Sequence, residues 1–416
     1  MRHMVTTRLI SILIVPTLLA LSPHAYPQDA GHYNTEGLAC YRSGDYAGAV
    51  RMFERAYRLE PDNKTIRSNL ANAHVAAAKE LVDANDLDSA IEELAAALEL
   101  RGEDANLYAY TASLCLKTGD LMSAEGMLLS ALDIDPEHKD GHLLLGEVYY
   151  RSGSLSEAIA EWRFILERDP SSKRARERLD KAERELKVEK DFVTAYNRRH
   201  FVINRDPERF EEESRTVLDI LEKAYYSIGR DLRHFPRNPV QVLLYSSAQF
   251  SEATRVNPHI AAVYDGKIRV GLSGRDYDDE SLERILRHEY THVIVRALTS
   301  GNTPFWFNEG LAQYESEELD ENKRRAISDA LVSGELIPLK DLDATHIDFG
   351  GNGARMRLAY LEGFAAVDYL RRRFTRRHLF DFMYMLAQQY DTETALKSVY
   401  RRTYDGLHRE VFSEYR

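Results

Sequence analysis

The sequence contains little cysteine, with 2 residues among 416. Two cysteines are too few for a disulfide framework or for a zinc site built from several cysteines. An excess of positive charge is also lacking, because 67 acidic residues outnumber 55 Lys and Arg and the formal net charge is −12. This charge argues against a nucleic-acid partner, which requires clustered cations to replace phosphate counterions. The length of 416 residues corresponds to two or three domains of ~150 residues each. The hydrophobic fraction of 44% is enough for each domain to bury a core.

Long apolar runs are scarce, and the most prominent one lies near the N-terminus. Arg2 and Arg8 precede an interrupted apolar stretch over 9–21, and a polar stretch over 22–29 follows it. This is the order of a secretory signal peptide, and the run is shorter than the ~20 apolar residues of a spanning helix. We therefore expect residues 1–25 to be a signal peptide and the protein to be exported, to the periplasm. Secretion is an alternative, as is an uncleaved N-terminal anchor, the one case in which a membrane is a partner.

Turn residues recur at a fixed interval in the first half of the chain. Asp86, Asp120 and Ser154 lie 34 residues apart, each after Asn or Gly, and Asp45 precedes the series. Each is followed four residues later by alanine and then by an amphipathic run. A helix–turn–helix unit of this length resembles the tetratricopeptide repeat (TPR). The resemblance implies an all-α solenoid of four units over 31–172, whose stacked helices leave a groove for a protein partner.

Three details of this array can be predicted. The second unit has seven extra residues, since Asp86 follows Asp45 by 41, and we place them in a longer first helix over 76–84. Cys40 and Cys115 occupy equivalent positions two units apart, too distant for a disulfide. The charge-dense segment 173–199 is predicted to be a capping helix that continues into a linker.

The second half of the chain has the patterns of a different fold class. Short strand-like segments lie at 200–204, 240–245 and 268–271. Helical periodicity covers 210–228, a long helix is expected from 279 to about 297, and further helices follow. This order predicts an α+β domain with a small sheet over 200–400, followed by a C-terminal helix over 401–416.

The long helix carries the pattern H-E-x-x-H at His288, Glu289 and His292. Residues four apart share one face of a helix, so both imidazoles can bind the same metal ion. Glu289 follows the first histidine directly and can direct its carboxylate at a metal-bound water as a general base. A surface helix with two unrelated histidines is the alternative, and it requires a second signal to exclude it.

That signal is Asn308-Glu309-Gly310, which begins 16 residues after His292 on the next expected helix. The pairing of H-E-x-x-H with a downstream glutamate resembles the gluzincin metallopeptidases, the thermolysin clan. Residues 200–382 resemble the peptidase-MA-like domain of bacterial exported proteins. The resemblance also rests on these segments: Leu243-Leu244-Tyr245, 263–270 and 360–366.

The resemblance implies a role for each matching residue. His288, His292 and Glu309 would bind one Zn²⁺ per chain. Glu289 would be the catalytic base that activates the zinc-bound water and then passes the proton to the leaving amine. Asn308 would hold a ligand in place.

Two further assignments follow from the resemblance, each with an alternative. Tyr360 stands where related domains carry a tyrosine that hydrogen-bonds the oxyanion, but it can equally be a half-buried helix aromatic. Residues 261–264 resemble the edge strand that pairs with the substrate backbone in this clan, although Asp265-Gly266 would mark a turn in any strand pair.

The sequence also departs from the family pattern. The spacing between His292 and Glu309 is shorter than in thermolysin, and Gln313 stands where an acidic residue supporting a ligand is expected. No acidic motif for a free substrate N-terminus is evident, which favours an endopeptidase. Other charged or ligating residues are predicted to be solvated or unrelated to the site: Glu315, Glu317, Glu318, His234, His259, His346, His378 and the arginines at 371–373 and 376–377.

Two functions are compatible with these patterns. The first is an exported zinc metallopeptidase that hydrolyses peptide bonds while its repeats recruit a protein substrate or partner. The second is a non-catalytic assembly scaffold of the cell envelope whose peptidase-like domain is vestigial. All four residues of the ligand-and-base set are present, which favours the enzyme.

Overall fold

The computed structural model describes residues 29–255, 261–272 and 278–416. The predicted signal peptide and His259 lie outside these residues. Within them, no helix is both long enough and apolar enough to cross a membrane. The chain divides into two compact units, 29–73 and 74–416, which are described in turn.

The first unit contains α1 (Ala30–Ser43), α2 (Tyr46–Leu59) and the start of α3 (Lys64–Asp83). Gly44 and Asp45 form the turn between α1 and α2. With a φ of 84°, Gly44 directs its amide to the last carbonyl groups of α1, and the Asp45 side chain accepts a hydrogen bond from an amide in the first turn of α2. Gly37 lies so close to the Phe53 ring that a Cβ there would be 2.7 Å from it. The absence of a side chain at Gly37 therefore permits the close approach of α1 and α2.

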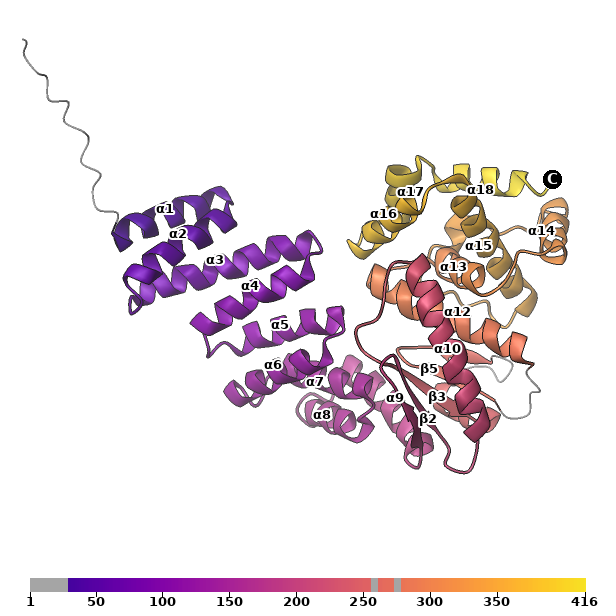
Figure 1. Cartoon of the computed structure of the whole chain (residues 1–416), viewed down its shortest axis with the longest axis horizontal. Helices are drawn as coiled ribbons and strands as arrows, with labels where there is room; N and C mark the ends of the chain where they lie inside the picture. The colour runs from indigo at the N-terminus through magenta and orange to yellow at the C-terminus, as the bar shows by residue number, and fades with distance from the viewer. Residues whose placement is uncertain (1–28, 256–260, 273–277) are drawn as a thin grey trace, which may run out of the picture. The chain divides into compact units, whose positions relative to one another are not determined.

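The second unit continues the array with the same architecture. Its helices are α4 (Leu87–Leu100), α5 (Ala105–Thr118), α6 (Leu121–Ile134), α7 (Lys139–Ser152) and α8 (Leu155–Arg168). Asp86 and Asp120 cap α4 and α6 as Asp45 caps α2, and Gly119 and Gly153 have positive φ angles of 83° and 95°, like Gly44. In Figure 1, the pairs α5/α6 and α7/α8 follow one another and lead into α9. The four predicted helix pairs are present.

Both cysteines are free thiols, in agreement with the prediction that they do not pair. Helix α3 has 20 residues, whereas every helix from α4 to α8 has 14. The extra residues of the second repeat unit therefore lengthen its first helix, as predicted.

The capping helix is α9 (Lys173–Glu189), which buries Ala175 and Ala182 against the fourth helix pair. The prediction of a linker after this helix is wrong for residues 193–197, which form strand β1 (Val193–Asn197). This strand has no buried residue and lacks the apolar alternation by which strands are recognised in a sequence. Its backbone pairing with the next strand, rather than burial, fixes it in the sheet.

The sheet has five strands in the order β1-β2-β3-β5-β4. The remaining strands are β2 (Phe201–Arg205), β3 (Val240–Tyr245), β4 (Ala262–Tyr264) and β5 (Ile268–Gly271). Strands β2, β3 and β5 are parallel, whereas β1 and β4 are antiparallel edge strands. Side chains alternate between the faces, so Val242 and Leu244 enter the main core, whereas Leu243 and Tyr245 pack with α11.

The helices that follow β2 pack around one core that includes one face of the sheet, except α11, which packs on the other face. They are α10 (Glu211–Asp231), α11 (Ser247–Thr254), α12 (Asp279–Thr299), α13 (Phe305–Ser316), α14 (Glu321–Ser333), the 3₁₀ turn η1 (Leu339–Leu342), α15 (Gly353–Arg373), α16 (Arg376–Ala387), α17 (Thr392–Tyr400) and α18 (Tyr404–Ser413). Leu407, Val411 and Phe412 of α18 lie in the same core, so the last helix is part of this domain. The predicted solenoid followed by an α+β domain is confirmed.

Candidate metal centre

Helix α12 presents the H-E-x-x-H residues on adjoining faces. Its N-terminus is capped by Asp278, which accepts a hydrogen bond from the Ser281 amide, and acidic residues occupy its first turn. The imidazole rings of His288 and His292 lie 4.8 Å apart between centroids, one turn from each other. Leu286 and Val293 bury the opposite side of the helix, which fixes the direction of the two histidines.

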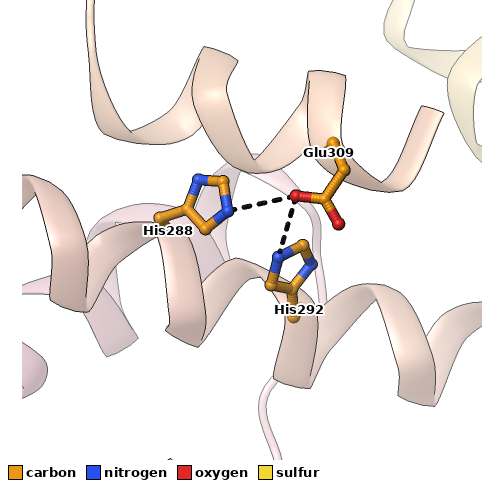
Figure 2. A group of neighbouring side chains, drawn as sticks. All are labelled: His288, His292 and Glu309. Atoms are coloured by element: carbon orange, nitrogen blue, oxygen red, sulfur yellow. Dashed lines mark ion pairs between the residues drawn. The ribbon is translucent and has the colours of Figure 1, made fainter. Parts of the chain in front are cut away.

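Helix α13 brings Glu309 to these histidines. Its Oε2 lies 3.3 Å from Nε2 of His288 and 3.5 Å from Nε2 of His292. Figure 2 shows the carboxylate pointing between the two rings, from a helix other than theirs. The three ligand atoms all lie within 4.8 Å of one another and form a group that could hold a metal ion.

The position of α13 depends on a close crossing with α15. A Cβ on Gly310 would lie 2.2 Å from the carbonyl oxygen of Gly363, and a Cβ on Gly363 would lie 2.4 Å from that of Trp306. Neither glycine can be replaced by alanine without moving a backbone. The glycine after Glu309 therefore sets the distance between the helices that carry Glu309 and Tyr360.

Asn308 orients the second histidine. Its side-chain Oδ1 lies 3.1 Å from Nδ1 of His292, so this ring nitrogen donates a hydrogen bond to Asn308 and Nε2 faces Glu309. The amide of Asn308 also donates to Oε1 of Glu309 at 3.3 Å. One side chain thus orients two candidate ligands, as expected for this residue.

Glu289 is buried beside the three candidate ligands. Burial is the main cause that raises the pKa of its carboxyl above the usual range, although His292 and His288 oppose the rise. The backbone of Tyr264 in β4 also opposes the rise, and β4 packs on α12. The edge strand therefore lies beside the predicted base, a contact that motif spacing does not reveal.

The electrostatics of the group reflect its mixed charges. Burial disfavours the charged form of His292, but the neighbouring Glu309 and Glu289 carboxylates outweigh it and raise its pKa to about 9. Burial likewise disfavours the ionised Glu309, but both histidines hold its pKa well below the usual range. Ionised Glu309 therefore supplies the negative charge that a cation between these residues requires.

Tyr360 lies at the edge of this group, half-buried on α15. Its ring stacks 6.5 Å from that of His288 and contacts Phe305 edge-on at 5.3 Å. Burial, together with the Glu309 and Glu289 carboxylates, raises the pKa of its hydroxyl, so the group is a hydrogen-bond donor at neutral pH. Tyr360 therefore lies close to the candidate ligands, and its role in a reaction stays a prediction.

The prediction that Glu315, Glu317 and Glu318 form a solvated face is wrong for two of the three. Glu315 is half-buried, and burial together with the neighbouring Asp231 carboxyl raises its pKa to about 8. Glu317 is half-buried between Arg284 and Lys323. Glu318 alone is exposed. Helical periodicity does not show that α10 and α15 cover this end of α13, which is why the error arises.

The other residues weighed from the sequence lie outside the group formed by His288, His292 and Glu309. His234 is half-buried and burial lowers its pKa, whereas His346 is exposed. The arginines of the basic segment are paired with nearby carboxylates rather than forming a free patch, through Arg371 and Arg376 with Asp231 and Arg372 with Glu414. Gln313 has a buried side-chain oxygen without a hydrogen-bond partner among the described residues.

The structure thus combines a helical repeat array with an α+β domain whose H-E-x-x-H helix faces a glutamate from the next helix. The family model described as the peptidase MA superfamily matches residues 229–413. Models described as tetratricopeptide repeats match residues 41–79, 75–138 and 112–173. The chain therefore contains tetratricopeptide repeats and a peptidase MA superfamily domain, as the sequence predicts.

Solved structures similar to part of the chain include repeat proteins. The TPR domain of Arabidopsis OM64 is 20% identical over 28% of this chain and 96% of its own, with a TM-score of 0.27. TTC0263, a TPR protein of Thermus thermophilus, is 21% identical over 37% and 98%, with a TM-score of 0.23. The MamA protein is 22% identical over 38% and 82%, with a TM-score of 0.30. A search of curated proteins gave no match.

Proposed function

We propose that this protein is an exported zinc-dependent metallopeptidase, an endopeptidase whose repeats recruit a protein substrate or partner. The observation that carries the proposal is the convergence of His288, His292 and Glu309 beside the buried Glu289. Two imidazoles and a carboxylate are the donor set of one class of catalytic zinc sites, in which the fourth position stays open.

The distances within the group support zinc as the metal. Ligands at ~2.0–2.1 Å from a tetrahedral zinc ion are separated from one another by ~3.3–3.4 Å. The two histidine–glutamate separations of 3.3 and 3.5 Å agree with this value. These two separations therefore need little change for the ion to bind.

Each residue of the chain has a defined task in this proposal. Zinc, when bound, would polarise the peptide carbonyl and lower the pKa of a water molecule. Glu289 would take the proton from that water, since burial raises the proton affinity of its carboxyl toward neutral pH. It would then deliver the proton to the leaving amine. The Tyr360 hydroxyl would donate a hydrogen bond to the carbonyl oxygen as negative charge develops there.

The experiment that tests the proposal measures zinc and hydrolysis on the same full-length preparations. Wild-type protein should contain about one zinc per chain, and His292→Ala should contain almost none because two ligands hold zinc poorly. His346→Ala, a matched control with an exposed histidine outside the group, should keep its zinc. If wild-type protein stays metal-free after zinc is supplied, the proposed enzyme is refuted and a non-catalytic scaffold explains the protein better.

Glu289→Gln separates catalysis from metal binding. This variant should retain its zinc and lose about 10²–10⁴-fold in the rate of cleavage of an unstructured protein such as labelled casein. Cleavage at the wild-type rate would remove Glu289 from the mechanism. Export is tested independently by locating the protein after cell fractionation and by sequencing its mature N-terminus.

A further inference from the structure

The hairpin formed by β4 and β5 joins the candidate active site to the end of the repeat array. On one side, β4 packs on α12, and the backbone of Tyr264 lies near the Glu289 carboxyl. Across the hairpin, Val263 of β4 pairs with Arg269 of β5. The hairpin therefore contacts the predicted base through one strand and carries a fully buried arginine on the other.

Arg269 is bound by three carboxylates through three different nitrogens. Its Nη2 lies 2.7 Å from Glu185, its Nη1 2.7 Å from Glu189 and its Nε 3.1 Å from Asp265. Its Nη2 also lies 3.2 Å from the Tyr150 hydroxyl. We name this cluster the buried junction; its members are Tyr150, Glu185, Glu189, Tyr245, Asp265, Lys267 and Arg269.

Both the repeat array with its capping helix and the peptidase domain contribute residues to the buried junction. Tyr150 comes from α7 of the fourth helix pair, and its hydroxyl donates to Glu185 at 2.7 Å. Glu185 and Glu189 come from the capping helix α9, whose other side packs on Trp162 of α8. A continuous set of contacts thus runs from the fourth repeat through α9 and Arg269 to the strand that touches Glu289.

The arrangement of charges in the buried junction requires an arginine at position 269. The three carboxylates of the junction face Arg269 and Lys267, which lies 3.7 Å from Glu185, and Lys181 at the edge of the cluster, which lies 2.8 Å from Asp265. A guanidinium has nitrogens on a rigid plane and can satisfy carboxylates in several directions, whereas an ammonium is a compact point charge. Lysine at position 269 would keep the charge but could not hold all three acids at once.

We infer that Arg269 is a positioning residue, through which the fourth repeat and the capping helix fix strand β4 against Glu289. The peptidase domain is therefore completed by the end of the repeat array rather than being an independent module. The catalytic consequence rests on the proposed function, whereas the structural consequence does not.

The test compares full-length wild-type protein with Arg269→Lys and with Arg163→Lys. Arg163 pairs with Glu183 at 2.6 Å on the exposed side of α9, so its variant is a matched control. Amide hydrogen exchange over 262–271 should be about tenfold faster in Arg269→Lys, because charged hydrogen bonds are lost. Exchange in α15 and the zinc content should equal those of the wild type. Arg163→Lys should match the wild type throughout.

Kinetics on labelled casein supply the second readout. Misplacement of Glu289 should lower kcat about tenfold or more in Arg269→Lys, with a smaller change in KM. Exchange over 262–271 equal to that of the wild type would overturn the inference, as would acceleration that is equal in α15, which would indicate general destabilisation. If Arg269→Lys does not fold, Glu189→Gln removes one of the three carboxylates and is judged by the same exchange measurement.

The two proposals can fail separately. Wild-type protein without zinc or hydrolysis would refute the proposed function, while exchange at the β4–β5 hairpin would still decide whether Arg269 positions this strand. Unchanged exchange in an active, zinc-containing enzyme would refute the positioning role alone.

Discussion

The peptidase domain touches the repeats in two regions that use the same kind of ion pair in opposite environments. In the buried junction, Arg269 and Glu185 are 2.7 Å apart and at most 1% exposed. In the second region, which we call the outer contact, Arg237 and Asp88 are also 2.7 Å apart but 63% and 57% exposed. The outer contact also includes the hydroxyl of Tyr384, which donates to the carbonyl oxygen of Ala84 at 3.0 Å.

Equal distances therefore do not mean equal energies. Water and salt screen an exposed pair, and the two side chains lose conformational entropy when they pair. A buried pair instead carries a large desolvation cost that its partners must offset, so removal of one partner leaves an uncompensated charge. The comparison predicts that the two regions respond very differently to the same substitution.

The largest effect is expected from Glu185→Ala. Arg269 and Lys267 would lose a buried counter-charge, which should lower the free energy of unfolding by about 3–5 kcal/mol. Urea denaturation followed by circular dichroism measures this loss. Glu183→Ala, on the exposed side of the same helix, should cost less than about 1 kcal/mol. A similar small cost for both variants would remove the distinction between the regions.

An intermediate effect, dependent on pH, is expected from Lys267→Met. Burial is the main cause that lowers the pKa of Lys267 below its usual 10.5, so the charged amine opposes folding. As the pH rises toward 10.5, the folded protein releases this proton before the unfolded chain does, and wild-type stability increases. Below its lowered pKa the amine is protonated in both states and this contribution is absent.

Lys267→Met cannot show this increase. At pH 7 its free energy of unfolding should lie within about 1 kcal/mol of the wild type, because an apolar side chain replaces a buried charge whose partner Glu185 still has Arg269. Urea midpoints measured from pH 7 to pH 10 should then shift upward more in the wild type than in the variant. Parallel profiles would show that Lys267 keeps an ordinary pKa.

The smallest effect is expected at the outer contact. Arg237→Gln, Asp88→Asn and the double variant form a cycle whose coupling energy should be below about 1 kcal/mol at low salt. In 0.5 M salt the coupling should fall close to zero because the Debye length shrinks to a few ångströms. A coupling energy that persists at high salt would show that this exposed pair behaves energetically like a buried one.

The part of the fold that repeats itself could be predicted most fully. Gly and Asp at fixed intervals define the helix pairs because each has a local role: glycine adopts the positive φ at a helix end, and aspartate caps an amide at the next helix start. His288, His292 and Glu309 could also be predicted, since helical spacing and one short turn bring them together. These features depend on neighbours in the sequence, which a pattern can encode.

The missed features depend on partners that are distant in the sequence. Strand β1 is held by backbone pairing with β2 rather than by an apolar pattern of its own. Arg269 belongs to a segment that resembles the peptidase family, yet two of its carboxylate partners lie in α9. Glu315 is covered by a helix that ends at Asp231. No local periodicity records such contacts.

The greater length of α3 has a consequence for how the array can change. With 20 residues instead of 14, this helix is ~9 Å longer than α4 to α8, and its end carries Ala84 to Tyr384. Between the pair α3/α4 and α9 stand two helix pairs of uniform size. Insertion of a third pair there would preserve every repeat yet shift one contact region away from its partner. The number of repeats between α3 and α9 is therefore set by the peptidase domain.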